Sequence, residues 1–292
     1  MNLQALIPVV LKASIFLTVF ALGLQATFAD ATFLFRRPKL LIRGFVSINV
    51  VMPWLALLLA MTLHLHPAVQ IALVALSVSP VPPIFPKKVL KAGGRENYTI
   101  GLLVATVVLA IVAIPITMEI FEKVTGVPLS ISSLSVAVIV FKTVLTPLLA
   151  GIVLRAITSS FADRLTKPIS LIAAVLLILS ALPALFVLIR NNLALLVDGT
   201  LLSLAAFAMV GYIVGRLFGG PDPEDRSVLA QATASRHPGL ALAIAHANFP
   251  EQKLVVPTVI LYVIVSGIVI ALASKVFKTK TLPAPATGPT AS

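Results

Sequence analysis

The chain of 292 residues contains no cysteine and little charge, since only 11% of its residues are Asp, Glu, Lys or Arg. Without cysteine there is no disulfide, iron–sulfur cluster or thiolate metal site. A typical soluble domain is about 25% charged, so this sequence has less than half the charge that normally covers a water-exposed surface. These shortages exclude a disulfide-stabilised domain and a water-soluble enzyme.

Apolar residues are abundant instead, at 59% of the chain, and the mean hydropathy is +1.09. Runs of about 20 apolar residues, the length that crosses a bilayer core as a helix, recur from end to end. The pattern predicts an all-α polytopic membrane protein with nine transmembrane helices. These spans are expected at about residues 4–27, 39–62, 67–91, 98–118, 134–156, 168–189, 195–216, 226–247 and 253–275.

The basic residues predict the orientation of these spans, because Lys and Arg are enriched in cytoplasmic loops. Most of the 22 Lys and Arg residues fall in every second loop, from the loop after span one to the segment after span nine. We therefore expect an integral, multi-pass protein of the cell (inner) membrane with its N-terminus outside and its C-terminus cytoplasmic. This dispersal also explains the net charge of +12 without a nucleic-acid partner.

Two of the predicted spans contain helix breakers near their middle. Ser79–Pro86 has prolines at 80, 82, 83 and 86, and Ser235–Gly239 contains Pro238. Proline removes a backbone donor and clashes with the preceding turn. The breaks, and the spans before and after them, lie about 156 residues apart, and the predicted orientations of the two halves are opposite. The sequence thus predicts an inverted repeat with two broken helices, a pattern that marks a transporter's substrate site.

Charged residues within the predicted spans are the main candidates for function. Arg236 and His237 lie at the second break, and all ten Asp and Glu residues lie in loops or near helix ends. A buried guanidinium is costly in a membrane, so Arg236 is expected to contact an organic anion, or alternatively to bond carbonyls freed at the break. His237 is a candidate for proton coupling, with a capping role as the alternative. The substrate-binding candidates are Ser79, Pro83, Phe85, Lys87, Thr233, Ser235, Arg236 and His237.

Several segments resemble the bile acid:sodium symporter family in its broad sense. They are Leu22–Gln25, Phe35–Lys39, Val51–Ala56, Pro67–Pro80 and Gly239–Ala243, and the similarity covers roughly residues 15–275. The resemblance implies alternating access between a core domain with crossed broken helices and a panel domain. Spans 2–4 and 7–9 are then the core, and spans 1, 5 and 6 the panel, within one transmembrane domain at 1–281. Residues 282–292 are expected to form a disordered tail.

The resemblance also implies sodium sites at the breaks, formed by Pro-Gly-Gly-Thr-Ala-Ser-Asn and Glu-x-Gly-x-Gln-Asn runs. When these are aligned on Pro80 and Gly239, the ligand positions fall on Phe85, Pro86, Ala232, Arg236 and His237. Phenylalanine and alanine offer no side-chain oxygen, and sodium is a hard cation that prefers oxygen ligands. The side-chain ligands of sodium are missing, and no cofactor is expected.

These observations predict a secondary active transporter of a small organic anion, embedded in the lipid bilayer, whose sodium dependence is weakened or lost. One alternative is a sodium-coupled symporter whose ligands are backbone carbonyls. Another is a membrane receptor or scaffold of the same fold that does not transport. The sequence contains no motif of an intramembrane enzyme, such as HExxH or GxSxG.

Overall fold

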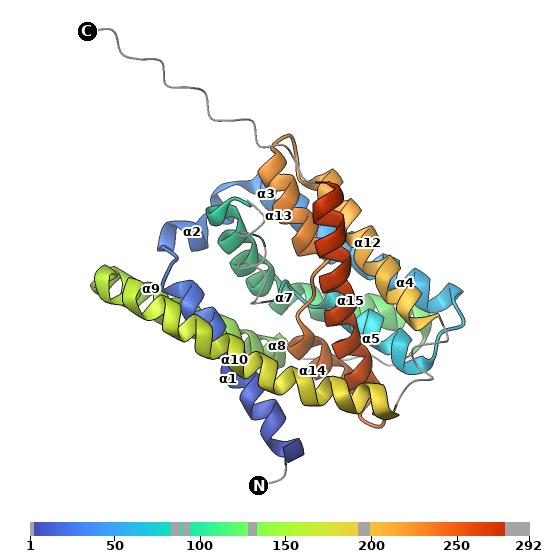
Figure 1. The fold of residues 1–292 in the computed structure, drawn as a ribbon. Coiled ribbons are helices and arrows are strands. Elements are labelled where there is room, and N and C mark those ends of the chain that lie inside the picture. Colours follow the sequence, from blue (N-terminus) through green and yellow to red (C-terminus); the bar gives the residue numbers. More distant parts are fainter. Residues whose placement is uncertain (1–2, 83–88, 90–93, 128–132, 192–198, 278–292) are drawn as a thin grey trace, which may run out of the picture.

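The computed structural model describes residues 3–82, 89, 94–127, 133–191 and 199–277 (Figure 1). In these residues the regular structure is entirely helical and contains no strand. Five helices are long and apolar enough to cross a membrane, at Pro38–Thr62, Glu96–Thr125, Leu134–Ile157, Thr200–Phe218 and Val255–Val276. The all-helical character of the membrane protein is therefore as predicted. The predicted tail at 282–292 lies outside the described residues.

The first predicted span corresponds to helix α1 (Leu3–Gly23), which ends four residues before the predicted end at 27. The loop that follows contains the short helices α2 (Phe28–Thr32) and η1 (Leu34–Arg36). Helix α2 begins with a capping box, in which Thr27 and Asp30 satisfy each other's backbone N–H groups. Helix α10 (Ser159–Asn191) is longer than the predicted span 168–189, and α1 packs against it.

Two of the long spans change their helical pitch immediately before a proline. In Pro38–Thr62, α3 (Pro38–Phe45) passes through the π-helical turn η2 (Val46–Val51) into α4 (Met52–Thr62). In Leu134–Ile157, α8 (Ser133–Val140) passes through the π-helical turn η3 (Phe141–Leu145) into α9 (Thr146–Ile157). Pro53 and Pro147 follow these turns. Because proline cannot donate to the preceding turn, a wider π-helical turn accommodates it, and such turns are frequent at functional sites.

The helices that flank the predicted breaks are short. Helix α5 (Pro67–Val78) ends immediately before Ser79, and the chain remains non-helical through Pro82. Helix α13 (Pro223–Thr233) ends before a non-helical segment at 234–237, and α14 (Pro238–Asn248) follows. The prolines therefore interrupt both helices where the sequence predicts it. The continuation of the first interrupted span, residues 83–88 and 90–93, lies outside the described residues.

The interrupted helices are surrounded by α4, α12 (Thr200–Phe218) and α15 (Val255–Val276). Helix α5 packs against α4, α14 and α15, while α12 packs against α13 and α15. Figure 1 shows α12, α13 and α15 side by side. Helix α7 (Glu96–Thr125) packs against α2 and α8. The breaks are thus enclosed by membrane-spanning helices, where non-helical backbone is tolerated because protein surrounds it.

Small residues bring α12 into close contact with α13. A Cβ atom at Gly211 would lie 2.9 Å from the Thr233 carbonyl oxygen, and one at Gly215 would overlap the Leu229 carbonyl oxygen. Small residues four positions apart allow this kind of close backbone approach between membrane helices. The two glycines therefore fix α13, and with it the second break, against the surrounding helix.

We expect Gly215→Val to destabilise the protein by about 3 kcal/mol or more, because the added side chain would collide with backbone that cannot rotate away. The measurement is the thermal unfolding midpoint of the detergent-purified protein. Ile213→Phe adds bulk to the same helix at a position that is 42% exposed, and this control is expected to leave the midpoint nearly unchanged. Equal midpoints for the two variants would show that the glycine contact is not needed.

Candidate functional site

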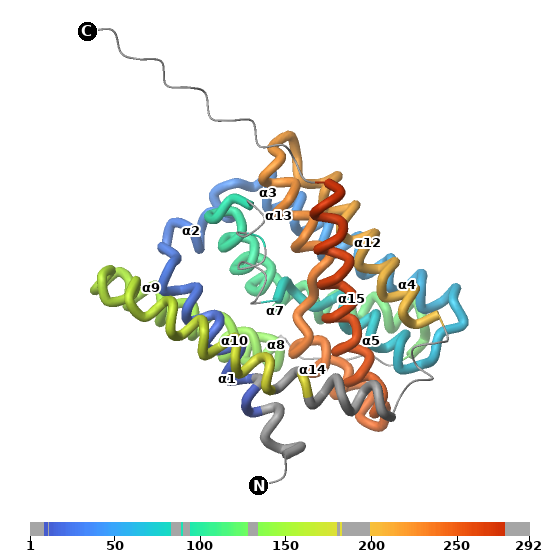
Figure 2. The backbone as a smooth tube through the Cα atoms, in the orientation of Figure 1, coloured from blue at the N-terminus to red at the C-terminus, as the bar shows by residue number. Residues whose placement is uncertain are grey.

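The two non-helical segments meet in the interior of the protein. The backbone N–H of His237, in the second break, donates a hydrogen bond of 2.9 Å to the carbonyl oxygen of Pro80, in the first break. Figure 2 shows the chain running from α13 through this segment into α14, which packs against α5. Residues that are far apart in the sequence are thereby held together at one junction, which we call the break junction (Ser79–Pro82 and Ala234–His237).

Three backbone carbonyls at this junction have no helical donor. Ser79 and Ala234 are the C-caps of α5 and α13, and the backbone after each of them is not helical. Ile48 lies in the π-helical turn five residues before Pro53, which has no N–H to donate. A buried carbonyl without a partner costs free energy comparable to a lost hydrogen bond, so side chains must supply the missing donors.

Arg236 supplies two of these donors. Its Nη1 atom lies 3.3 Å from the carbonyl oxygen of Ile48 and 3.3 Å from that of Ser79. One guanidinium nitrogen therefore joins the first break to the π-helical turn η2. The third carbonyl, that of Ala234, accepts a hydrogen bond of 2.8 Å from the hydroxyl of Tyr262 in α15. Each of these three carbonyls is therefore bonded by a side chain from another part of the chain.

The rest of the Arg236 guanidinium is buried without a partner. The residue is 2% exposed, and its Nε and Nη2 atoms have no hydrogen-bond partner in the part of the chain that the structure describes. Nor does any carboxylate in the described residues form an ion pair with it. The C-terminal ends of α5 and α13, which carry partial negative charge, lie at the same junction and help to hold the cation there.

His237 acts as the N-cap of α14. Its Nδ1 atom accepts a hydrogen bond of 3.2 Å from the backbone N–H of Leu240, and the residue is 3% exposed. This satisfies one of the backbone N–H groups in the first turn that have no acceptor within the helix. The capping role that the sequence left open is therefore present in the structure. Proton coupling through His237 stays a prediction.

Three other candidates lie at or beside the junction, with polar atoms bonded within the protein. The hydroxyls of Thr233 and Ser47 are 2.6 Å apart, and the Ser79 hydroxyl donates to the carbonyl of Leu76. Ser235 is 8% exposed, and its backbone N–H donates to the carbonyl of Ala232. The remaining candidates, Pro83, Phe85 and Lys87, lie outside the described residues.

The contributions of η2 and Tyr262 to the junction were not predicted from the sequence. Ile48 contributes through its backbone, which its side-chain type does not reveal, and Tyr262 stands in a long apolar run. The signal in the sequence is Pro53, since a proline inside a predicted span frees a carbonyl four or five residues earlier. Such a carbonyl indicates that a polar residue on a neighbouring span donates to it.

We expect Tyr262→Phe to destabilise the protein by about 1–3 kcal/mol, because it leaves the Ala234 carbonyl buried without a donor. Tyr98→Phe is the matched control, since the Tyr98 hydroxyl is buried without a hydrogen-bond partner among the described residues. Removing that hydroxyl is expected to be neutral or stabilising. Thermal unfolding of both variants tests the difference, and a Tyr98→Phe variant as unstable as Tyr262→Phe would contradict it.

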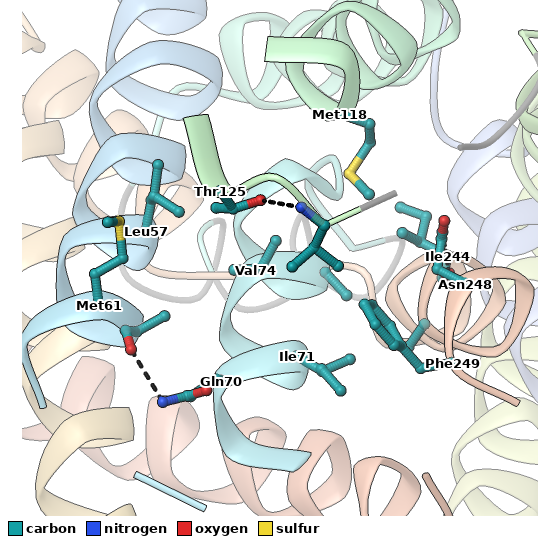
Figure 3. A pocket seen from close by; sticks show the side chains of 14 residues that line it. Leu57, Met61, Gln70, Ile71, Val74, Met118, Thr125, Ile244, Asn248 and Phe249 are labelled. Atoms are coloured by element: carbon teal, nitrogen blue, oxygen red, sulfur yellow. Dashed lines mark hydrogen bonds between the residues drawn. The ribbon is translucent and has the colours of Figure 1, made fainter. Parts of the chain in front are cut away.

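An apolar cavity of about 170 Å³ lies between α4, α5, α7 and α14 (Figure 3). Val74 of α5 and Ile244 of α14 line it, and Gln70, Thr125 and Asn248 are polar residues in its wall. Gln70 donates to the carbonyl of Ala60, as Figure 3 shows. Arg236 does not line this cavity. Among the described residues, the side chains around Arg236 leave it 2% exposed, so the break junction is closed to solvent in this conformation.

An ion-pair cluster joins the beginning of α7 to the beginning of α13. Arg95 pairs with Asp222 and lies 3.5 Å from Asp225 and 3.9 Å from Glu224. Burial raises the pKa of the Asp225 carboxyl above its ordinary value, and the positive charge of Arg95 opposes that rise. The cluster brings together two loops that the sequence places on the same side of the membrane.

Comparison with known protein families gives one finding. The model of the family described as the sodium bile acid symporter family matches residues 13–198. That range includes the first break and ends before the second. A search of curated proteins finds no match.

Proposed function

Because this chain belongs to the sodium bile acid symporter family, we propose that it is a secondary active transporter that carries an organic anion across the membrane by alternating access. Family membership and the five long apolar helices make it an integral membrane protein of a transporter family. The substrate class and the coupling are our inference from the break junction.

The free edge of the Arg236 guanidinium is the observation that carries the proposal. Nη1 is engaged by two carbonyls, while Nε and Nη2 have no partner in the described structure. Nε and Nη2 form a planar edge whose parallel N–H groups match the two oxygens of a carboxylate. A buried charge is costly unless it is paired. An anionic substrate that reaches this edge would remove that cost, which favours binding of a carboxylate.

The same geometry supports a transporter that does not depend on sodium. In many transporters, carbonyls of unwound helices coordinate the coupling cation. Here the carbonyls of Ser79 and Ile48 are bonded to Arg236, which already places a positive charge at the junction. Ala232, which the resemblance to the family aligns with a glutamate, offers no side-chain oxygen. Sodium coupling through backbone carbonyls would require Arg236 to withdraw from both of these partners.

The proposed architecture has nine spans, an inverted repeat and a core that moves against a panel. The packing supports the division into a panel and a core. Helices α1, α9 and α10 of the proposed panel contact one another, whereas α5 of the proposed core contacts α4, α14 and α15. The ion pair between Arg95 and Asp222 supports the proposed topology, since it links two loops assigned to the cytoplasmic side. In this scheme the N-terminus is outside and the C-terminus is cytoplasmic.

A receptor or scaffold that binds an anion without transporting it is the second candidate. The closed junction favours it, because Arg236 is 2% exposed and is anchored to two separate backbone segments. Such anchoring would oppose the opening that transport needs. Binding of an acid without flux would support this candidate.

Uptake into proteoliposomes tests the proposal. Purified protein is reconstituted and supplied with a library of labelled carboxylates, from short-chain acids to large amphipathic acids. We expect saturable uptake of at least one acid in sodium-free buffer, well above that of empty liposomes. If no acid is taken up, yet an acid stabilises the purified protein against heat, the receptor reading replaces the transporter reading.

A further inference from the structure

Two consecutive residues of the π-helical turn η2 bond the second break. The hydroxyl of Ser47 lies 2.6 Å from the hydroxyl of Thr233, and the carbonyl oxygen of Ile48 lies 3.3 Å from Nη1 of Arg236. Thr233 is the last residue of α13, and Arg236 follows it in the non-helical segment. Ser47, Ile48 and Thr233 are fully buried. The two hydrogen bonds therefore join the same two segments, and both are shielded from water.

The turn η2 has the features of a hinge in its span. Sharp bends in helices occur at prolines and at π-helical turns, and here a π-helical turn is followed by Pro53, which cannot donate to the carbonyl of Ile48. In the other π-helical turn, η3, the Thr143 hydroxyl donates to the carbonyl of Ile139 in its own span. In η2, by contrast, the hydroxyl of Ser47 bonds a different helix. This bond is therefore placed where movement of the span would break it.

The closed junction has an energetic cost that bonds of this kind offset. The Nε and Nη2 atoms of Arg236 are buried without a partner among the described residues, and a buried charge is costly unless it is paired. Water that entered the junction would hydrate these atoms, so the guanidinium favours opening. The bond between Ser47 and Thr233 opposes opening, because the two hydroxyls separate if η2 moves away from α13.

We propose that Ser47 and Thr233 form a latch that holds the break junction closed and releases Arg236 when η2 moves away from α13. Both are positioning residues, since they act through Arg236. Thr233, a substrate-binding candidate from the sequence, then influences the substrate only through this bond. The consequence for acid binding rests on the proposed function: an acid that binds only the open junction has an apparent Kd that falls as the open fraction rises.

An introduced cysteine measures opening without any substrate, because the chain has no cysteine of its own. Ser235→Cys places a thiol in the second break, at a residue that is 8% exposed, and a water-soluble thiol reagent labels it when the junction opens. We expect Ser47→Ala to raise this labelling rate about three- to tenfold, the factor that corresponds to one net hydrogen bond. Thr233→Val is expected to raise it equally, and the two changes together no further. Unchanged rates in both variants would overturn the proposal.

Two controls separate release of the latch from a general loss of stability. Ser14→Ala removes a buried hydroxyl that donates a bond of 2.7 Å from α1 to the carbonyl of Ala173 in α10, and it is expected to leave the labelling of Ser235→Cys unchanged. Ala162→Cys places a thiol at a buried position of α10 and is expected to react at the same slow rate with and without Ser47→Ala. Equal acceleration at both introduced cysteines would show that the whole protein loosens, and would overturn the proposal.

Acid binding tests the link to the proposed function. Ser47→Ala is expected to lower the unfolding midpoint and yet to lower the apparent Kd of a stabilising acid about three- to tenfold, because more of the protein is open. A merely structural role would weaken stability and binding together. An unchanged or weaker Kd for an acid that binds the wild-type protein would contradict the latch. If no acid binds, the proposed function fails, and the labelling rates still decide whether the latch exists.

Discussion

Replacing Arg236 by alanine is expected to lower the kcat/KM for uptake of the transported acid by at least about 30-fold. Truncating one partner of a buried, hydrogen-bonded charge pair typically costs about 2–5 kcal/mol, and each 1.4 kcal/mol is a factor of ten. The variant loses the Nε and Nη2 edge that would bind the carboxylate. It also loses the donor shared by the carbonyls of Ser79 and Ile48.

Further variants separate these two roles of Arg236. Arg236→Gln keeps an amide donor for a carbonyl but no charge, so we expect a folded protein with uptake as low as in Arg236→Ala. Arg236→Lys keeps the charge without the planar fork, and its uptake is expected to be intermediate. Arg155→Ala is the matched control, because Arg155 also bonds a backbone carbonyl, that of Leu24, away from the junction. Normal uptake by Arg236→Gln would contradict an anion-binding role for Arg236.

Replacing sodium by choline is expected to change uptake by the wild-type protein less than about twofold. If the change is in apparent affinity for the acid, it corresponds to a free energy of under about 0.4 kcal/mol. A sodium-coupled transporter would instead lose most of its uptake. The physical reason is that a fixed guanidinium occupies the carbonyls that a hard cation would need. The measurement is initial uptake at constant ionic strength and constant membrane potential, with potassium as a second replacement ion. A steep and saturable requirement for sodium would show that carbonyls elsewhere form a cation site.

Hydropathy and proline placement predicted most of the helices, because the bilayer imposes helix length and proline removes a specific backbone donor. Helix α5 ends at Val78 and α14 begins at Pro238, where the prolines require it. Hydropathy was less informative about where a helix begins when its first residues are polar. Helix α10 begins nine residues earlier than predicted, since Ser159–Lys167 is helical although polar.

The candidate site was predictable in part. A charged residue in an apolar span is conspicuous, so Arg236 was identified, and the break beside it implied free carbonyls nearby. The partners of Arg236 were not predictable, because Ile48 lies 188 residues away and acts through its carbonyl. Tyr262 was not predicted for a similar reason, since its hydroxyl bonds the Ala234 carbonyl, which is free because α13 ends at that residue.

Thermal stabilisation by organic acids in sodium-free buffer tests whether Arg236 binds an anion without sodium, because it measures binding at the break junction without requiring transport. Wild-type protein and Arg236→Gln are titrated with the same acids, with and without sodium. We expect an acid to stabilise the wild-type protein equally well in both buffers and not to stabilise Arg236→Gln. Stabilisation that appears only with sodium, or that persists in Arg236→Gln, would contradict it.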